Sequence, residues 1–207
     1  MVMTPVLAPE EHARLTEEIR KAEAGTSGEI YVVVAHSADT FRLVPVLWAA
    51  VFALLLPWVL HLTTSLSAMM ILSLQVLGFV VAASILSLHQ VRYRIVPPAI
   101  AEDAAHRAAL AQFMAHGVHL TSARTGVLIY VTMRPRRIEV VADSGIHAKV
   151  GQEAWDSTVA AITAEARAGR LSDGLAAGIR TAGTLLSRHF PRGATDRNEL
   201  PDRVVEG

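Results

Sequence analysis

The sequence contains no cysteine and only two lysines among its 207 residues. Without cysteine, the chain has no disulfide scaffold, no thiolate zinc site and no thiol nucleophile. Its 19 basic and 19 acidic side chains cancel, so no positive excess favours nucleic acid as a partner. The sequence also lacks the G-x-S-x-G, P-loop, G-x-G-x-x-G and H-E-x-x-H motifs. Most common enzyme classes therefore have no support.

Charge is missing from one continuous stretch, residues 43–91, which contains no Lys, Arg, Asp or Glu. Within it, residues 43–60 and 68–88 are apolar runs that reach roughly 27 and 31 Å as helices, at ~1.5 Å per residue. The hydrocarbon core of a bilayer is about 30 Å thick. The short polar stretch 61–67 between the runs suits a turn. The sequence therefore predicts two transmembrane helices joined as a hairpin in a lipid bilayer.

Basic residues lie at the outer ends of this predicted hairpin. Arg42 precedes the first span, Arg92 and Arg94 follow the second, and the turn has neither Lys nor Arg. Basic residues favour the cytoplasmic side, so we expect both termini in the cytoplasm. The arginine-rich and alanine-rich composition indicates a bacterial gene and hence an inner membrane. Tyr93, between two arginines, is typical of the headgroup region, and we expect these four residues to form the membrane interface.

The interior of the hairpin favours an anchor over a transport pathway, because transport usually needs charges or broken helices at depth. Gln75 is the one strongly polar side chain deep in either run, and we expect it to form a hydrogen bond between helices. Small residues recur four apart at Ala49/Ala53 and Gly78/Ala82. This spacing favours close packing, either within the hairpin or in a homo-oligomer.

The remaining sequence predicts one discontinuous α/β domain from residues 1–40 and 95–191. A helix precedes a buried, central strand at residues 29–35. After the hairpin, a second helix, an antiparallel strand pair and two more helices follow, and we expect residues 192–207 to be a disordered tail. The strand pair is expected at residues 127–132 and 138–142, and the core-facing stripe of the second helix at Ile100, Ala104, Ala108, Ala111, Met114 and Val118.

The polar group with most chemical potential follows the last predicted strand: Asp143, Gly145 and His147, with Asp156 further on. In α/β folds such residues at a sheet edge often contact ligands. A carboxylate there could hold a divalent cation such as calcium, or a phosphate-bound water. The structural alternative is equally simple, because Asp and Gly form turns and Asp156 complements a helix dipole. The sequence identifies no cofactor.

The order of several segments resembles the TPM domain family, named for thylakoid-lumen, photosystem-repair and receptor-modulator proteins. The similarity covers residues 9–35 and 100–191. It rests on Gly28-Glu-Ile-Tyr-Val-Val-Val-Ala35, Thr125-Gly-Val-Leu-Ile-Tyr-Val131, Arg137-Ile-Glu-Val-Val-Ala-Asp-Ser-Gly-Ile146, and Gly169-Arg170 to Gly174-Leu-Ala-Ala-Gly178.

The resemblance implies an α/β/α sandwich with a mixed sheet of at least three strands, which the hairpin interrupts. Similar plant proteins are associated with acid phosphatase activity and photosystem II repair, and many relatives are membrane-attached. The family often has Asp-Asn-Gly where this chain has Arg124-Thr125-Gly126. Two functions stay open: a non-enzymatic accessory factor that binds a membrane protein, and a phosphatase-like hydrolase of phosphomonoesters that uses Asp143 with a divalent cation.

Overall fold

The computed structural model describes residues 5–193 and 198–207, and the chain forms two compact units. The first unit joins residues 1–38 to residues 102–207, and the second comprises residues 39–101. The second unit is therefore an insertion into the chain of the first.

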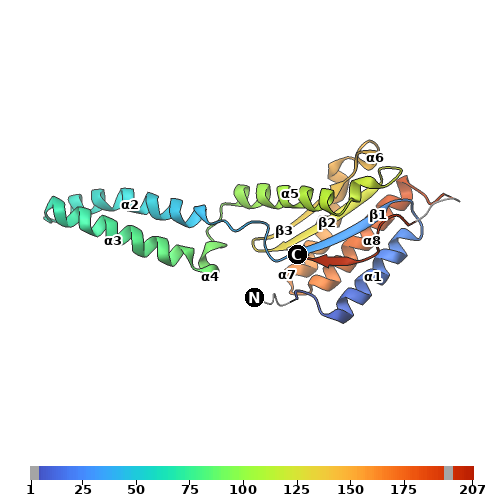
Figure 1. The fold of residues 1–207 in the computed structure, drawn as a ribbon, viewed down its shortest axis with the longest axis horizontal. Coiled ribbons are helices and arrows are strands. Elements are labelled where there is room, and N and C mark those ends of the chain that lie inside the picture. The colour runs from blue at the N-terminus through green and yellow to red at the C-terminus, as the bar shows by residue number, and fades with distance from the viewer. Residues whose placement is uncertain (1–4, 194–197) are drawn as a thin grey trace. The chain divides into compact units, whose positions relative to one another are not determined.

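The first unit is built on a mixed four-stranded sheet in the order β3-β2-β1-β4 (Figure 1). β1 runs parallel to β2 and β4, whereas β2 and β3 form an antiparallel hairpin. Every residue of β1 is buried, which confirms the central strand that its β-branched sequence predicts. The strands are β1 (Glu29–Ala35), β2 (Gly126–Met133), β3 (Arg136–Ala142) and β4 (Val204–Glu206).

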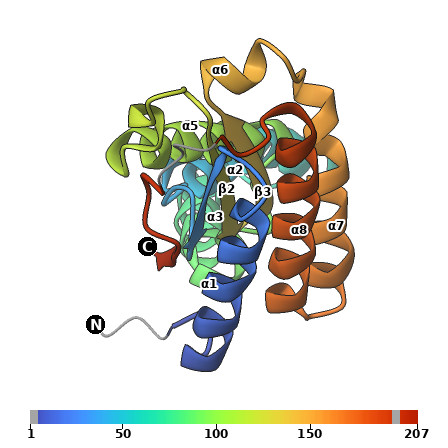
Figure 2. The ribbon, with the colours of Figure 1, turned by 90° about the vertical axis from the view of Figure 1, so that its right-hand side faces the viewer.

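Helices cover both faces of this sheet and complete the predicted α/β/α sandwich (Figure 2). One face packs against α1 (Pro9–Glu23), α7 (Asp156–Arg167) and α8 (Leu171–His189). The other face packs against α5 (Pro98–Ala115). Alternation along β1 explains the two cores, because successive side chains of a strand point to opposite faces. Four shorter helices are α4 (His89–Arg92), η1 (Val118–Leu120), α6 (Ser144–His147) and η2 (Gln152–Trp155).

The predicted core stripe of α5 is partly wrong. Ala104 is buried, but Met114 is 58% exposed, and the buried residues towards the end of the helix are Ala109 and Phe113. Tyr31 and Tyr130 belong to the same core cluster, and these bulky side chains leave room mainly for alanine methyl groups opposite them. The helix therefore presents a small-residue face to the sheet and turns several large side chains outward.

The predicted disordered tail is also wrong for residues 198–207, while residues 194–197 lie outside the described residues. β4 pairs with β1, and the backbone of Gly207 is hydrogen-bonded to Val34 and His36. The Glu206 carboxylate accepts hydrogen bonds from the backbone N–H groups of Val6 (2.8 Å) and Leu7 (2.9 Å). These long-range contacts order a segment that has no hydrophobic periodicity of its own.

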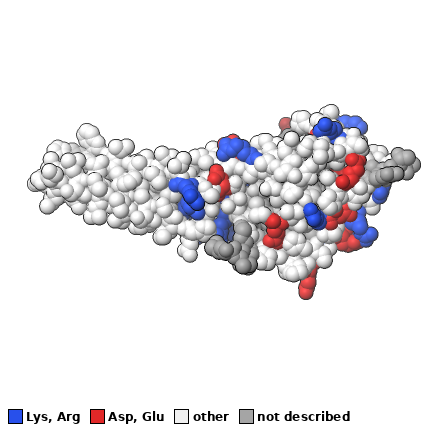
Figure 3. Space-filling model, viewed as in Figure 1, with Lys and Arg blue, Asp and Glu red and all other residues white. Residues whose placement is uncertain are grey.

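The second unit consists mainly of two antiparallel helices, α2 (Leu43–Thr63) and α3 (Ala68–Ser87). Both are long and apolar enough to cross a membrane. Ala49 and Ala53 are buried, and a Cβ atom on Gly78 would lie 2.9 Å from Leu56, so small residues let the helices pack closely. Most of the large apolar side chains face outward, and the visible surface of this hairpin is free of charge over most of its length (Figure 3).

Candidate functional site at one edge of the sheet

Three strand ends meet along one edge of the sheet, the edge that runs across the strands at Glu29, Gly126 and Asp143. β1 and β2 begin there, at Glu29 and Gly126, which are paired across the parallel ladder. β3 runs the opposite way and ends there, so that Asp143 follows it and donates its N–H to the Gly126 carbonyl (2.9 Å). Adjacent strands lie about 4.8 Å apart, which places the Cα atoms of Glu29 and Asp143 roughly 10 Å apart across the Gly126 backbone.

Asp143 has one satisfied and one unsatisfied carboxylate oxygen. Asp143 is the N-cap residue of α6, and its Oδ1 atom accepts hydrogen bonds from the N–H (2.6 Å) and hydroxyl (3.1 Å) of Ser144. Its Oδ2 atom is buried without a hydrogen-bond partner among the described residues, and the whole residue is 6% exposed. A buried acceptor without a partner is costly. This atom is the strongest candidate for contact with a ligand or an ordered water.

Gly145 fixes the position of α6 against the preceding loop. A Cβ atom there would lie 2.6 Å from the Ala123 carbonyl oxygen and 2.5 Å from that of Arg124, so only glycine fits. Arg124 itself has φ +55°, in the left-handed region. The Arg124 guanidinium donates to the His119 carbonyl (2.8 Å), and Thr125 donates its hydroxyl to the Ser27 carbonyl (2.8 Å). The loop before β2 is thus held by backbone contacts.

The four predicted site residues do not converge equally. Asp143 and Gly145 lie together at the start of α6, whereas His147 is exposed at the end of this short helix. Asp156 is exposed in the first turn of α7, where it complements the helix dipole. Calcium takes about six to eight oxygen ligands. Among the described residues, no group of three His, Cys, Asp or Glu side chains could hold a metal ion, and the cation hypothesis stays a prediction.

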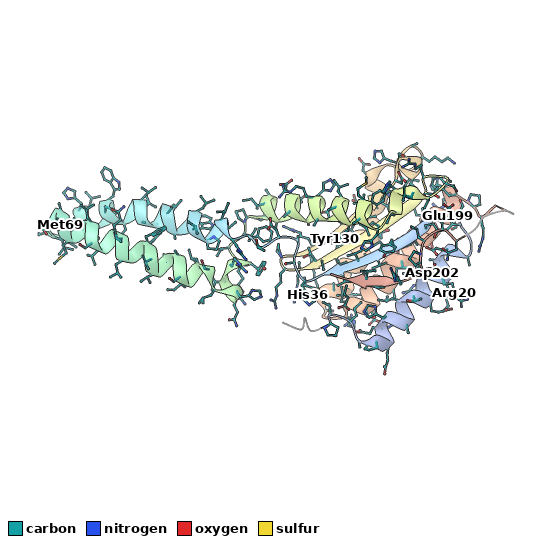
Figure 4. The ribbon with its side chains drawn as sticks, in the orientation of Figure 1. Arg20, His36, Met69, Tyr130, Glu199 and Asp202 are labelled. Atoms are coloured by element: carbon teal, nitrogen blue, oxygen red, sulfur yellow. The ribbon has the colours of Figure 1, made fainter. Side chains whose placement is uncertain are left out.

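A second acidic group at this edge escaped the sequence prediction. Glu23, Glu29 and Asp202 line a polar cavity of about 420 Å³, together with basic side chains that include Arg20. Figure 4 shows Asp202 and Arg20 near this edge. Glu29 is buried, and its carboxylate accepts hydrogen bonds from the backbone N–H groups of Glu199 (3.2 Å) and Leu200 (3.4 Å). The chain after residue 198 therefore forms one wall of the cavity.

Glu23 has a strongly perturbed carboxyl group. Burial raises the pKa of Glu23 to about 9, although a hydrogen bond from the Ile30 N–H (2.6 Å) opposes the shift. The nearby Glu29 and Asp202 carboxylates raise this pKa further. Glu23 is therefore protonated at neutral pH and can donate a hydrogen bond to Asp202. The sequence contains one signal of this group, because Glu29 opens a buried strand. A buried carboxylate needs hydrogen bonds or a nearby positive charge.

The predicted membrane-interface residues gather at one end of the hairpin. Arg42 immediately precedes α2, and the other three follow α3, so the antiparallel helices bring them to the same end. The Arg92 guanidinium lies over the Tyr93 ring, 5.1 Å from its centroid, and Arg94 is exposed. Tyr93 also packs edge-on against Phe41. An aromatic ring among arginines is typical of the headgroup level of a bilayer. Met69 lies near the opposite end (Figure 4).

Comparison with known proteins adds a family and a fold. Residues 87–185 match the model of the TPM domain, which confirms the family resemblance of that part of the chain. A similar solved structure is the NMR structure of BA42 protein from the psychrophilic bacterium Bizionia argentinensis sp. nov.. It is 23% identical, with a TM-score of 0.63, and the match covers 99% of this chain and 98% of that chain. That likeness concerns the fold alone. No curated protein is similar enough to match.

Proposed function

We propose, from the membership of residues 87–185 in the TPM domain family, that this protein is a membrane-anchored accessory factor. It binds another protein of the same membrane and catalyses no reaction of its own. The hairpin of α2 and α3 anchors the chain in a bacterial inner membrane. Both termini are cytoplasmic in this proposal, because the arginines lie at the outer ends of the spans.

The large apolar surface of the hairpin supports the anchor. Leu62 is 81% exposed, Met69 75% and Trp58 67%. Soluble monomers rarely expose contiguous apolar patches larger than a few hundred Å². Burying such side chains in lipid gains roughly 1.5–3 kcal/mol each, and both helices satisfy their backbone hydrogen bonds internally.

The single observation that carries the binding role is the outer face of α5. Leu110 is 42% exposed and Met114 58%, four residues further on, so both lie on one side of the helix. Leu120, 71% exposed, follows in η1. Large apolar side chains on the solvent side of a helix mark protein interfaces. We propose that the partner protein packs against this α5 outer face, defined by Leu110 and Met114, and that Leu120 in η1 extends the contact.

Affinity purification of the full chain in mild detergent tests this role. The wild type should recover one specific membrane protein, and Leu110→Lys/Met114→Lys should lose it, because two charges would be buried at the interface. The matched control is Ala160→Lys/Ala164→Lys, which adds two lysines four apart on exposed positions of α7. Recovery of the same partner by wild type and both variants, or of none by the wild type, refutes the proposal.

A second function, hydrolysis of phosphomonoesters, is favoured by one observation, the buried and unsatisfied Oδ2 atom of Asp143. A generic phosphomonoester assay on the full chain, with and without calcium or magnesium, separates the two functions. If the protein is a hydrolase, Asp143→Asn should abolish turnover while leaving thermal unfolding nearly unchanged. Equal turnover by wild type and variant, or none in either, rejects this second function.

A further inference from the structure

A cavity of about 480 Å³ lies at the opposite edge of the sheet from Asp143. It is formed where β2 ends, where β3 begins and where α7 turns into α8. In parallel α/β sheets, ligands bind outside the carboxyl ends of the strands, and this cavity adjoins that end of β2. Its walls are mostly apolar, from Val131, Ile138, Val159 and Leu171.

Three arginines also line this cavity. Arg136 and Arg137 come from the start of β3, and Arg167 comes from the end of α7. None of the described residues that line it is acidic. Arg136 and Arg167 are exposed and form no ion pair with any described residue. Arg136 and Arg167 therefore give this cavity a positive charge that attracts anions.

The combination of apolar walls and arginines defines the ligand class. Guanidinium groups bind phosphate oxygens through paired N–H donors. A free phosphate would leave the apolar walls without a partner, whereas an anionic phospholipid presents a phosphate and adjoining apolar carbon. We propose that this arginine cavity binds the headgroup region of an anionic phospholipid.

The chain itself keeps this cavity within reach of such a lipid. β1 ends at Ala35, whose register partner is Thr132, one of the residues that line the cavity. Residues 36–42 then lead to α2 and extend at most roughly 25 Å at about 3.6 Å per residue. The proposed bilayer therefore lies within that chain length of this sheet edge. Access of the cavity to lipid depends on the proposed membrane insertion. Its affinity for lipid depends on the residues that line it.

Native mass spectrometry of the full chain in detergent tests the inference, with phosphatidylglycerol as the anionic probe and phosphatidylcholine as the zwitterionic one. Arg136→Ala/Arg167→Ala should weaken phosphatidylglycerol binding roughly twenty-five-fold, from about fivefold for each arginine near a lipid surface. The control Arg188→Ala/Arg203→Ala removes the same charge from exposed positions outside the cavity. It should change the affinity less than about twofold, a limit below the effect of one surface arginine. Equal thermal unfolding of both variants excludes a folding defect.

Three results would overturn the inference: equal loss in both double variants, equal binding of the two phospholipids, or binding of glycerol phosphate as tight as that of phosphatidylglycerol. The last result would identify a site for a free phosphate. Resistance of the protein to alkaline carbonate extraction from membranes is measured separately. Phosphatidylglycerol binding without such resistance would contradict the proposed anchor while supporting the cavity, so the two failures are distinguishable.

Discussion

Replacement of Glu23 by glutamine should stabilise the first unit at pH 8 and have little effect at pH 4. The pKa of Glu23 is about 9 in the folded protein, against an ordinary value of 4.5. Between these values the unfolded chain loses a proton that the folded chain retains, so folding stability falls as pH rises from 4.5 to 9. Below 4.5 both states are protonated and the penalty disappears.

The size of the effect follows from this shift. Each pH unit above 4.5 costs about 1.4 kcal/mol, which sets an upper limit of about 5 kcal/mol at pH 8. Rearrangement of the charged carboxyl group towards the nearby basic side chains reduces this limit. A glutamine preserves the geometry, because its carbonyl can accept from Ile30 and its amide can donate to Asp202. We therefore expect a gain in unfolding free energy of about 1–3 kcal/mol at pH 8, a usual range for changes at buried polar groups.

Tryptophan fluorescence can measure this gain in the full chain. Trp155 is 1% exposed in the first unit, and Trp48→Phe/Trp58→Phe removes the two tryptophans of α2. Urea unfolding at pH 4 and pH 8 then reports on the first unit, with the exposed Glu102→Gln as a control. A gain for Glu23→Gln that is equal at both pH values, or a loss at pH 8, would refute the assigned protonation.

Three further changes test separate contacts. Gly145→Ala should cost about 1–3 kcal/mol of unfolding free energy in the same urea assay, as overpacking does, because its methyl group would collide with the Arg124 carbonyl; an unchanged midpoint contradicts this. The pKa of Glu206 is lowered: burial alone would raise it, but hydrogen bonds from Val6, Leu7 and His12 outweigh burial. Glu206→Gln should therefore cost about 1–2 kcal/mol at pH 7 and less as pH falls below the ordinary pKa of 4.5, and an equal loss at pH 3 and pH 7 would count against it. Gly78→Leu should separate α2 from α3, so that a thiol crosslink between cysteines introduced at the ends of the two helices forms more slowly than in a Gly78→Ala control; equal rates contradict close packing.

Local sequence predicts the strands of this fold well where their residues are continuous and apolar. Glu29–Ala35 is a strand with the predicted bounds, and the β2–β3 hairpin begins one or two residues earlier than expected. Strand β4 could not be predicted in this way. It has only three residues, and it is ordered by β1 and by the bonds of Glu206 with residues almost 200 positions away.

In the candidate site, too, local sequence predicts some features and long-range contacts determine the others. The proximity of Asp143 and Gly145 follows from their sequence spacing, and the structure adds the unsatisfied oxygen of Asp143. The sequence did not reveal the polar cavity lined by Glu23, Glu29 and Asp202, because Glu23 belongs to a surface helix and Asp202 to a charged tail. Only the return of the chain along β1 brings these side chains together. The arginine cavity likewise needs the turn between α7 and α8, which brings Arg167 towards β3.

The insertion of the hairpin between β1 and β2 has a consequence for biosynthesis. A ribosome makes β1 first and must add about 90 residues before β2 exists, which takes roughly 5–20 s at usual elongation rates. During that interval the hairpin leaves the ribosome and can enter a translocon, while β1 remains an apolar segment without a partner strand. If the hairpin is inserted as proposed, membrane integration precedes completion of the sheet, and a nascent-chain chaperone that shields β1 would improve the yield of native protein.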